Sequence, residues 1–211
     1  MSIRLHSFSR LALLGGLLTL LSACSILPSP EPLRIFLLPT SAPSSAPLAE
    51  QSPHYALRIN TPQASRILSS PRIAVVPRGN EISAYQGARW SDAAPVLLRD
   101  RLIEAFQRDG RMPSVSNEDD NLPADLALHS DLRAFQSVYV DGSPQVVIRL
   151  DARLVNQHDH RTLANRRFEI HQASTDPGVE SVVEAFGQAS DRLSRELLDW
   201  TFEQARKIPT R

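Results

Sequence analysis

Residues 146–155 have the sequence VVIRLDARLV. Every second residue from Val146 onward is apolar, and the residues between them are charged, apart from a valine at each end. Successive side chains of a β-strand point to opposite faces of its sheet, so this alternation predicts a long strand. One of its faces is buried and the other is solvated, a pattern that favours antiparallel pairing. The residues of the buried parity are Val146, Ile148, Leu150, Ala152 and Leu154.

The segment before this strand predicts its partner in the sheet. Asp141-Gly142-Ser143 separates the two segments, and Asp-Gly is a common turn pair in antiparallel hairpins. A further strand over residues 161–171 would continue the meander. In the partner strand every second residue is apolar, except at Ser130. These apolar residues are Leu126, Leu128, Leu132 and Ala134.

Two segments have apolar residues at helical spacing. The first covers residues 94–106, with an expected cap at Ser91 or Asp92. The second is expected to begin with Asp176 as its cap and Pro177 as its first residue. Its apolar stripe consists of Val179, Val182, Val183, Phe186, Ala189, Leu193, Leu197 and Trp200.

Shorter strands are predicted ahead of the first helix. Together with the meander they indicate an α/β fold of the α+β kind, in which a mixed, largely antiparallel sheet carries two main helices. The last of these strands is expected to end at Tyr85 and to be followed by a loop that reaches Trp90. The predicted strands are residues 34–38, 55–59, 72–76 and 81–85.

Composition limits the class of protein. The 211 residues include 23 Lys and Arg against 23 Asp and Glu, so the formal charge is zero. Proteins that bind nucleic acid through a basic face need an excess of cations, and we therefore expect no nucleic-acid partner. One cysteine is too few for an internal disulfide framework or a CxxC zinc site.

The position of that cysteine, Cys24, is informative. A basic segment with Arg4 and Arg10 precedes the apolar run at residues 11–21, which has the length of a signal-peptide core and is too short to span a membrane. Leu-Ser-Ala-Cys then ends at Cys24 and resembles the bacterial lipobox. That resemblance implies cleavage before Cys24, a thioether-linked diacylglycerol and an N-acyl chain. The alternative is an ordinary secretory signal followed by an incidental or buried thiol.

The domain boundaries follow from this interpretation. Residues 1–23 are the expected lipoprotein signal peptide, and residues 24–33 are the lipidated cysteine and a proline-rich tether. Residues 34–207 form one domain with a Pro/Ser-rich loop at 40–53, and residues 208–211 are a tail. Without residues 1–23 the chain has 21 basic and 23 acidic side chains, a net charge of −2.

The sequence contains no recognisable catalytic motif, so we expect no enzyme and no cofactor other than the acyl groups on Cys24. His158-Asp159-His160 has metal-ligand residue types, but two histidines complete only half of a tetrahedral site. We interpret it as a solvated hairpin turn. Glu118, Asp119 and Asp120 lack the spacing and the glycine of an EF-hand.

Two groups of residues are candidates for partner binding. Tyr85 and Trp90 precede the first helix and are of the aromatic type enriched in interface centres. The alternative is that both rings fill the junction of sheet and helix. Arg149 and Arg153 lie on the solvated face of the long strand, where they either bind a partner or form cross-strand ion pairs.

The order of these features resembles the ABC-type transport auxiliary lipoprotein family, which includes the lipoproteins of paraquat-inducible and other MCE-type lipid transport systems. Phe36 stands where the family usually has a tyrosine, and the loop at 40–53 is long. The features that carry the resemblance are Cys24, Phe36-Leu37-Leu38-Pro39, Leu57-Arg58-Ile59 with Pro62 and Ile67-Leu68, Tyr85 and Trp90 before the helix, and Asp125-Leu126 with Phe135.

The resemblance implies a domain related to anticodon-binding-like or TolB N-terminal-like folds. It also implies a non-enzymatic accessory of an envelope lipid transporter that docks to MCE-domain proteins served by an ABC permease and ATPase. Ser25 after the cysteine, in place of Asp, resembles sorting to the periplasmic face of the outer membrane. A ring of several copies is an open alternative to a single copy. The rival function is a structural or regulatory outer-membrane lipoprotein, such as a cell-wall synthase activator or assembly-machine accessory.

Overall fold

The fold is organised around a hairpin of two long antiparallel strands, β7 (Leu126–Val140) and β8 (Ser143–Asn156), as the alternating sequence predicts. The computed structural model describes residues 32–40 and 55–208. Asp141 and Gly142 form the turn with φ values of 49° and 79°, the left-handed backbone that a tight hairpin of this type requires. β9 (Thr162–Ala173) pairs antiparallel with β8 and completes the predicted meander.

One irregularity changes which side chains of β7 face the core. Leu132 keeps the expected register, but Arg133 is an extra residue, and Ala134 pairs with Arg149 on the outer face. Ala134 therefore does not share the parity of Leu132, although it is buried as predicted, at 3% exposed. Phe135 takes the inward position and is 1% exposed. A β-bulge of one residue reverses the parity of everything that follows it.

Shorter strands extend the sheet from the other edge of β7. β2, β3 and β4 pair with β7 in parallel, and β5 pairs with β4 in an antiparallel hairpin. β1 and β6 lie at the two ends of the path β1-β5-β4-β7-β2-β6. The mixed, largely antiparallel sheet is therefore confirmed. These strands are β1 (Arg34–Phe36), β2 (Ala56–Ile59), β3 (Gln63–Ala64), β4 (Arg72–Arg78), β5 (Glu81–Trp90) and β6 (Ser114–Ser116).

β5 is twice as long as the sequence suggests. The prediction of a loop between Tyr85 and Trp90 is wrong, because the strand continues to Trp90. Its second half pairs in parallel with β1, with Arg34 opposite Ala88 and Phe36 opposite Trp90. A partner distant in sequence thus makes a strand of a segment whose local pattern resembles a loop.

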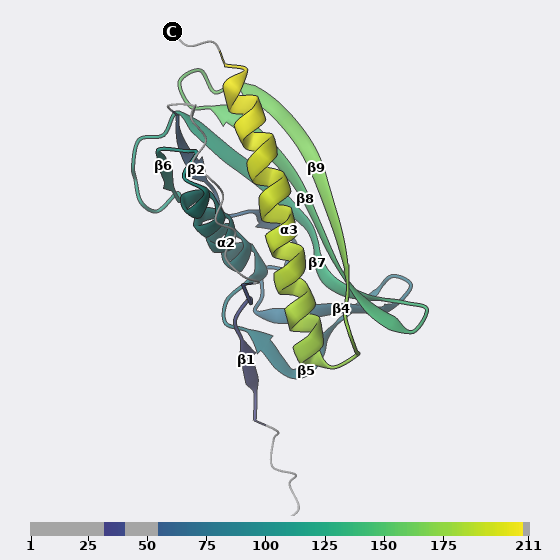
Figure 1. Cartoon of the computed structure of the whole chain (residues 1–211). Helices are drawn as coiled ribbons and strands as arrows, with labels where there is room; N and C mark the ends of the chain where they lie inside the picture. The colour runs from purple at the N-terminus through teal and green to yellow at the C-terminus, as the bar shows by residue number, and fades with distance from the viewer. Residues whose placement is uncertain (1–31, 41–54, 209–211) are drawn as a thin grey trace, which may run out of the picture. The chain divides into compact units, whose positions relative to one another are not determined.

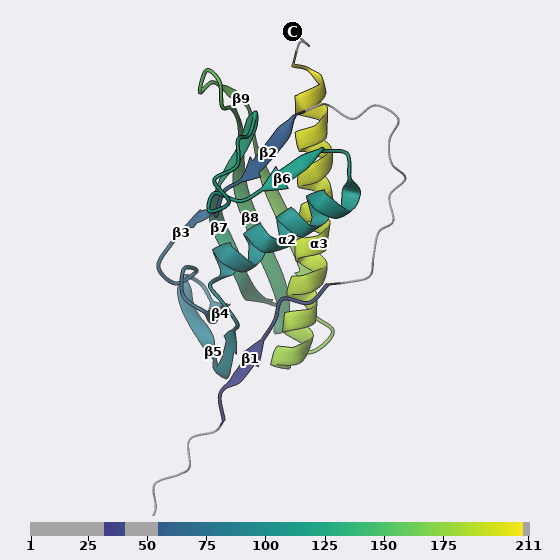
Figure 2. The ribbon, with the colours of Figure 1, turned by 90° about the vertical axis from the view of Figure 1, so that its left-hand side faces the viewer.

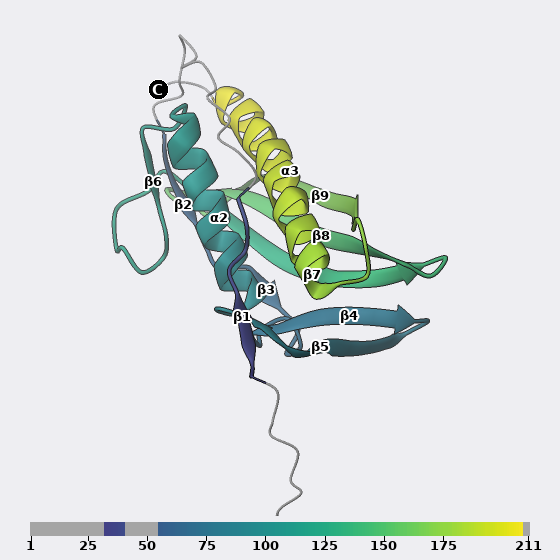
Figure 3. The same cartoon turned by 60° about the horizontal axis from the view of Figure 1, so that its bottom comes forward.

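The two main helices, α2 (Ala94–Asp109) and α3 (Val179–Arg206), pack side by side on one face of the sheet (Figures 1 and 3). Figure 2 shows both helices in front of β7 and β8. α3 contacts β8 and β9, whereas α2 contacts α3, β2 and β6. The predicted apolar stripe of α3 is buried in this layer, from Val179 at 8% exposed to Leu197 at 0%. The prediction of two main helices packed on the sheet is confirmed.

Both helices begin later than their predicted caps. α2 follows Ala93 without a side-chain cap, and Asp92 only accepts a hydrogen bond from the Ala93 amide. α3 begins after Gly178, so the prediction of Asp176 as its cap is wrong. The carboxylate of Asp176 accepts hydrogen bonds from the Gly178 amide and from the Ser181 hydroxyl, which fixes the turn ahead of the helix.

Candidate interaction surface

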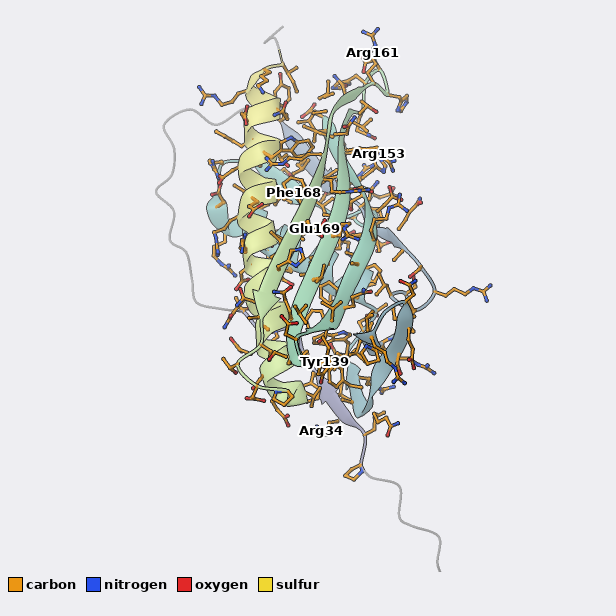
Figure 4. The ribbon with its side chains drawn as sticks, turned by 90° about the vertical axis from the view of Figure 1, so that its right-hand side faces the viewer. Arg34, Tyr139, Arg153, Arg161, Phe168 and Glu169 are labelled. Atoms are coloured by element: carbon orange, nitrogen blue, oxygen red, sulfur yellow. The ribbon has the colours of Figure 1, made fainter. Side chains whose placement is uncertain are left out.

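The face of β7, β8 and β9 opposite the helices carries a continuous set of polar side chains (Figure 4). The helices pack on the other face, so these side chains are partly or fully solvated. We call this surface the polar sheet face. It consists of His129, Asp131, Arg133, Arg149, Asp151, Arg153, Arg167, Glu169 and His171.

Strand register brings these residues together. Asp131 on β7 lies opposite Asp151 on β8, which lies opposite Arg167 on β9. One step further along the same face, Arg149 lies opposite Glu169. Residues directly opposite each other on neighbouring strands are close enough for their side chains to interact. The face is therefore a network of cross-strand contacts.

Asp151 is at the centre of this network of contacts. Its carboxylate accepts two hydrogen bonds from Arg167, at 2.6 Å from Nε and 2.8 Å from Nη2, and a third at 3.1 Å from Arg133. The hydrogen bonds from Arg167 are the main reason that the pKa of Asp151 falls to about 2. The carboxylate therefore keeps its charge throughout the neutral range.

Arg149 and Glu169 form a second bidentate pair. Nε and Nη2 of Arg149 lie 2.9 Å and 2.7 Å from the two carboxylate oxygens of Glu169. These hydrogen bonds lower the pKa of Glu169 to about 2. His171 adds a contact of 3.1 Å to the same carboxylate. Arg149 is thus held in one orientation rather than free to move.

Arg153 is held more loosely. Its Nη2 lies 3.4 Å from Asp131, and its side chain is 48% exposed. Burial lowers the pKa of the neighbouring His129, and the charges of Arg153 and Arg58 lower it further. The polar sheet face has four arginines against the three carboxylates of Asp131, Asp151 and Glu169. Its excess of positive charge contrasts with the slightly acidic composition expected for the mature chain.

The structure places both predicted arginines, Arg149 and Arg153, on this one surface, and shows that the cross-strand ion pairs are formed. Reasoning from β8 alone missed Asp131, Arg133 and Arg167 on the adjoining strands. The positions of Asp131 and Arg133 follow from the Asp-Gly turn, which sets the register of the hairpin, once the bulge at Arg133 is known, whereas the position of Arg167 depends on the register of β9. An open cleft of about 400 Å³ adjoins this face, between β3 and the segment Asp131–Arg133 of β7.

Trp90, also a candidate for partner binding, lies away from the surface. The residue is 0% exposed, and its ring packs edge to face against Phe186 and Phe135, at centroid distances of 5.2 Å and 6.1 Å. Its Nε1–H has no hydrogen-bond acceptor among the described residues. This position is the junction of sheet and helix that the sequence offered as the alternative, so we do not include Trp90 in the candidate surface.

Tyr85 is half-buried and lies on β5. Its hydroxyl is 3.3 Å from the Ser137 hydroxyl on β7, and burial raises the pKa of the phenol. Only part of the ring is accessible, so Tyr85 borders a surface rather than forming the centre of one.

The remaining predictions concern sites outside the polar sheet face. Cys24 lies outside the described residues, as do residues 1–31 and most of the loop at 40–53. Within the described ranges, no cluster of three His, Cys, Asp or Glu side chains could hold a metal ion. His158 contacts Asp125 at 3.2 Å and lies in the turn between β8 and β9. None of the described helices combines the length and the apolar character needed to cross a membrane.

Comparison with known proteins supports a family relationship. The sequence model of the ABC-type transport auxiliary lipoprotein component family matches residues 36–197. An uncharacterized protein of Bradyrhizobium diazoefficiens is 30% identical over 146 residues, which are 69% of this chain and 39% of that protein. The chain therefore spans well under half the length of this relative.

Solved structures agree with the fold. The crystal structure of protein XCC0632 from Xanthomonas campestris has 30% sequence identity and a TM-score of 0.75, and the match covers 82% of this chain and 97% of that one. A second crystal structure, of an uncharacterized protein, has a TM-score of 0.64 at 16% identity, covering 81% and 99% of the two chains. The second likeness concerns the fold alone.

Proposed function

Since the chain belongs to the family of ABC-type transport auxiliary lipoprotein components, we propose that it is a non-enzymatic accessory of an envelope lipid transporter. Lipidated Cys24 holds it on the periplasmic face of the outer membrane, and residues 24–33 tether the domain. The domain docks to a periplasmic MCE-domain subunit, which an inner-membrane ABC permease and ATPase serve. The polar sheet face is the docking surface.

The observation that carries this proposal is the polar sheet face itself. It is an uncovered sheet surface whose arginines are already oriented by carboxylates, as in Arg149 with Glu169. Oriented side chains lose less conformational entropy on binding than flexible ones do. Arginine is enriched at protein interfaces, and the excess positive charge favours a partner with an acidic patch.

The docking test is the capture of partners from detergent-solubilised envelopes with the tagged full-length lipoprotein. In one variant Arg149→Glu is combined with Glu169→Arg, which keeps the ion pair and exchanges its charges. Capture of the MCE-domain subunit is expected to fall by about tenfold, equivalent to about 1.4 kcal/mol. The exchange preserves the pair but removes the contact of Glu169 with His171, so urea unfolding of the variant is needed to separate a loss of docking from a loss of stability.

The matched control is Arg195→Glu, on the exposed side of α3 and away from the sheet. It should capture as much partner as the wild type. Equal capture by the charge exchange and the wild type contradicts docking through the polar sheet face. Capture of cell-wall synthases or an assembly machine, with no transporter subunit, favours the rival function of a structural or regulatory lipoprotein.

The anchor is tested separately. Growth with radiolabelled palmitate should label the wild-type chain, and Cys24→Ser should abolish the label and leave the signal peptide uncleaved. Three acyl chains exceed the two membrane-binding signals needed for stable anchoring, so the wild type should remain in the membrane fraction at high salt. An unlabelled wild-type chain of precursor mass would refute lipidation.

A further inference from the structure

One end of the domain combines the start of β1 with the tips of two hairpins. Figure 4 shows Arg34, the first residue of β1, and Tyr139, close to the tip of the β7–β8 hairpin, at the same end, with Arg161 at the opposite one. β1 runs parallel to β5 with Arg34 opposite Ala88. This direction turns the start of β1 toward the part of β5 that leads back to the β4–β5 hairpin.

The two hairpin tips expose large apolar side chains. Ile82 on β5 is 42% exposed, and Tyr139 and Val140 on β7 are 36% and 49% exposed. We call these three residues the apolar tips. The two hairpins are neighbours because β4 pairs with β7, with Val76 opposite Val138 just before the tip. The turn at each tip is short and polar. The turns themselves therefore do not require apolar side chains at these three positions.

The strand that leads into the domain also exposes apolar side chains, although Figures 1 and 3 show it apart from the two hairpin tips. Leu33 is 53% exposed and Ile35 is 57% exposed. The charges of Arg78 and Glu81 cancel in an ion pair of 3.2 Å, and Asp141 in the β7–β8 turn leaves a net charge of only −1 on these residues. Apolar contact, rather than net charge, is therefore what this end of the domain offers a partner.

The length of the chain before the domain identifies that partner. Cys24 and Leu33 are nine positions apart, and an extended chain covers at most about 3.6 Å for each residue. If Cys24 carries lipid, Leu33 lies within roughly 30 Å of the membrane surface. A tether of this length keeps the local concentration of lipid high, so that a small apolar surface suffices for contact.

We propose that the apolar tips rest in the headgroup region of the membrane that holds Cys24. Tyrosine suits this depth because it presents an apolar ring and a polar hydroxyl, and aliphatic tips can enter the boundary with the acyl chains. This contact orients the domain so that the polar sheet face does not touch the membrane. That face then remains accessible to a periplasmic partner. The inference rests on the lipid anchor of the proposed function.

The composition of the chain makes a clean test possible. Cys24 is the only cysteine, and its thiol is blocked when it carries diacylglycerol. In a chain with Val140→Cys, the new thiol is then the only site for a fluorescent maleimide. Arg161→Cys, at the opposite end of the domain, is the matched control (Figure 4). Both are exposed positions at which cysteine removes no buried contact.

The labelled full-length lipoproteins are reconstituted into phosphatidylethanolamine–phosphatidylglycerol vesicles that contain nitroxide-labelled lipid. We expect the probe at position 140 to be quenched at least threefold more than the probe at position 161. Adding Ile82→Asp to the Val140→Cys chain should reduce this difference. Equal quenching at the two positions overturns the inference, including the case in which the tips bind an envelope protein instead of lipid.

The wild-type chain separates this inference from the proposed anchor. If its Cys24 reacts with the maleimide, the thiol carries no lipid and the anchor proposal fails, together with the inference that rests on it. If Cys24 does not react and the two probes are quenched equally, the anchor stands and only the membrane contact of the tips is refuted.

Discussion

Arg101 on α2 lies 2.9 Å from the carboxylate of Asp191 on α3, and the two side chains are only 5% and 11% exposed. The same guanidinium donates hydrogen bonds to the backbone carbonyls of Leu38, at 2.9 Å, and Pro39. One nearly buried cation thus connects both helices to the segment that follows β1. β1 lies between this segment and the proposed anchor at Cys24, so a pull on the tether would reach Arg101 through β1.

Replacing Arg101 should destabilise the domain strongly. Arg101→Met keeps much of the apolar stem but leaves the Asp191 carboxylate and two carbonyls without the guanidinium. Removing one partner of a buried ion pair typically costs about 3–5 kcal/mol, and we expect a loss in the free energy of unfolding within this range. Urea unfolding followed by circular dichroism measures it. Arg195→Met on the exposed side of α3 should change stability by less than about 0.5 kcal/mol.

Gly187 offers an independent test of the same junction. It lies one helical turn before Asp191 on α3, and a Cβ atom built there would be 2.8 Å from the carbonyl oxygen of Pro39. Helix propensity alone predicts that Gly187→Ala stabilises the domain by about 1 kcal/mol. The clash with backbone should outweigh this gain, for a net loss of about 1–2 kcal/mol in urea unfolding. A more stable variant would show that the segment can move away without cost.

The sequence predicts the pairing of strands well where each strand has a clear alternation of apolar and polar residues. The alternation in residues 146–155 and the Asp-Gly turn are sufficient for the β7–β8 hairpin, its register near the turn and its solvated face. The polar side chains on that face follow from parity. The position of Arg149 could thus be predicted from local pattern, whereas its pairing with Glu169 depends on the register of β9.

Features that depend on distant partners could not be predicted. The second half of β5 is a strand because β1 pairs with it, and β3 exists as two residues paired to β7. The bulge at Arg133 moves Phe135 into the core, where it stacks on Phe186 at 4.7 Å. Each of these depends on contacts between segments far apart in the chain, which leave little trace in local periodicity.

Trp90 illustrates how burial changes the interpretation of an aromatic residue. Its Nε1–H has no acceptor among the described residues, so Trp90→Phe loses ring volume but also removes a buried unpaired donor. We expect a cost of only about 1 kcal/mol for phenylalanine, against about 3–5 kcal/mol for Trp90→Ala. Urea unfolding distinguishes the two variants. If Trp90→Phe costs as much as Trp90→Ala, the expectation of an unpaired Nε1–H is contradicted, and that group donates a hydrogen bond in solution.

The ion pairs of the polar sheet face predict how stability depends on acid. In the folded chain the pKa of Asp151 and the pKa of Glu169 are both about 2, below their ordinary values. A carboxyl group with a lowered pKa contributes stability above its unfolded pKa and loses that contribution as the pH falls through its folded pKa. Stability should therefore decline between about pH 4.5 and pH 2. The groups are partly exposed, so solvent screens each pair and its contribution is small, and salt should weaken the effect further.

Arg167→Gln isolates the part of this decline that belongs to Asp151. The variant should be less stable than the wild type at pH 7, and the difference should shrink as the pH falls toward 2, the folded pKa at which Asp151 of the wild type is about half protonated. Urea unfolding at pH 7, 4 and 2, each at low and high salt, measures the difference. Arg195→Gln, away from the sheet, should follow the wild-type profile at every pH. A constant difference between Arg167→Gln and the wild type across the range would mean that Arg167 acts through packing and not through the charge of Asp151.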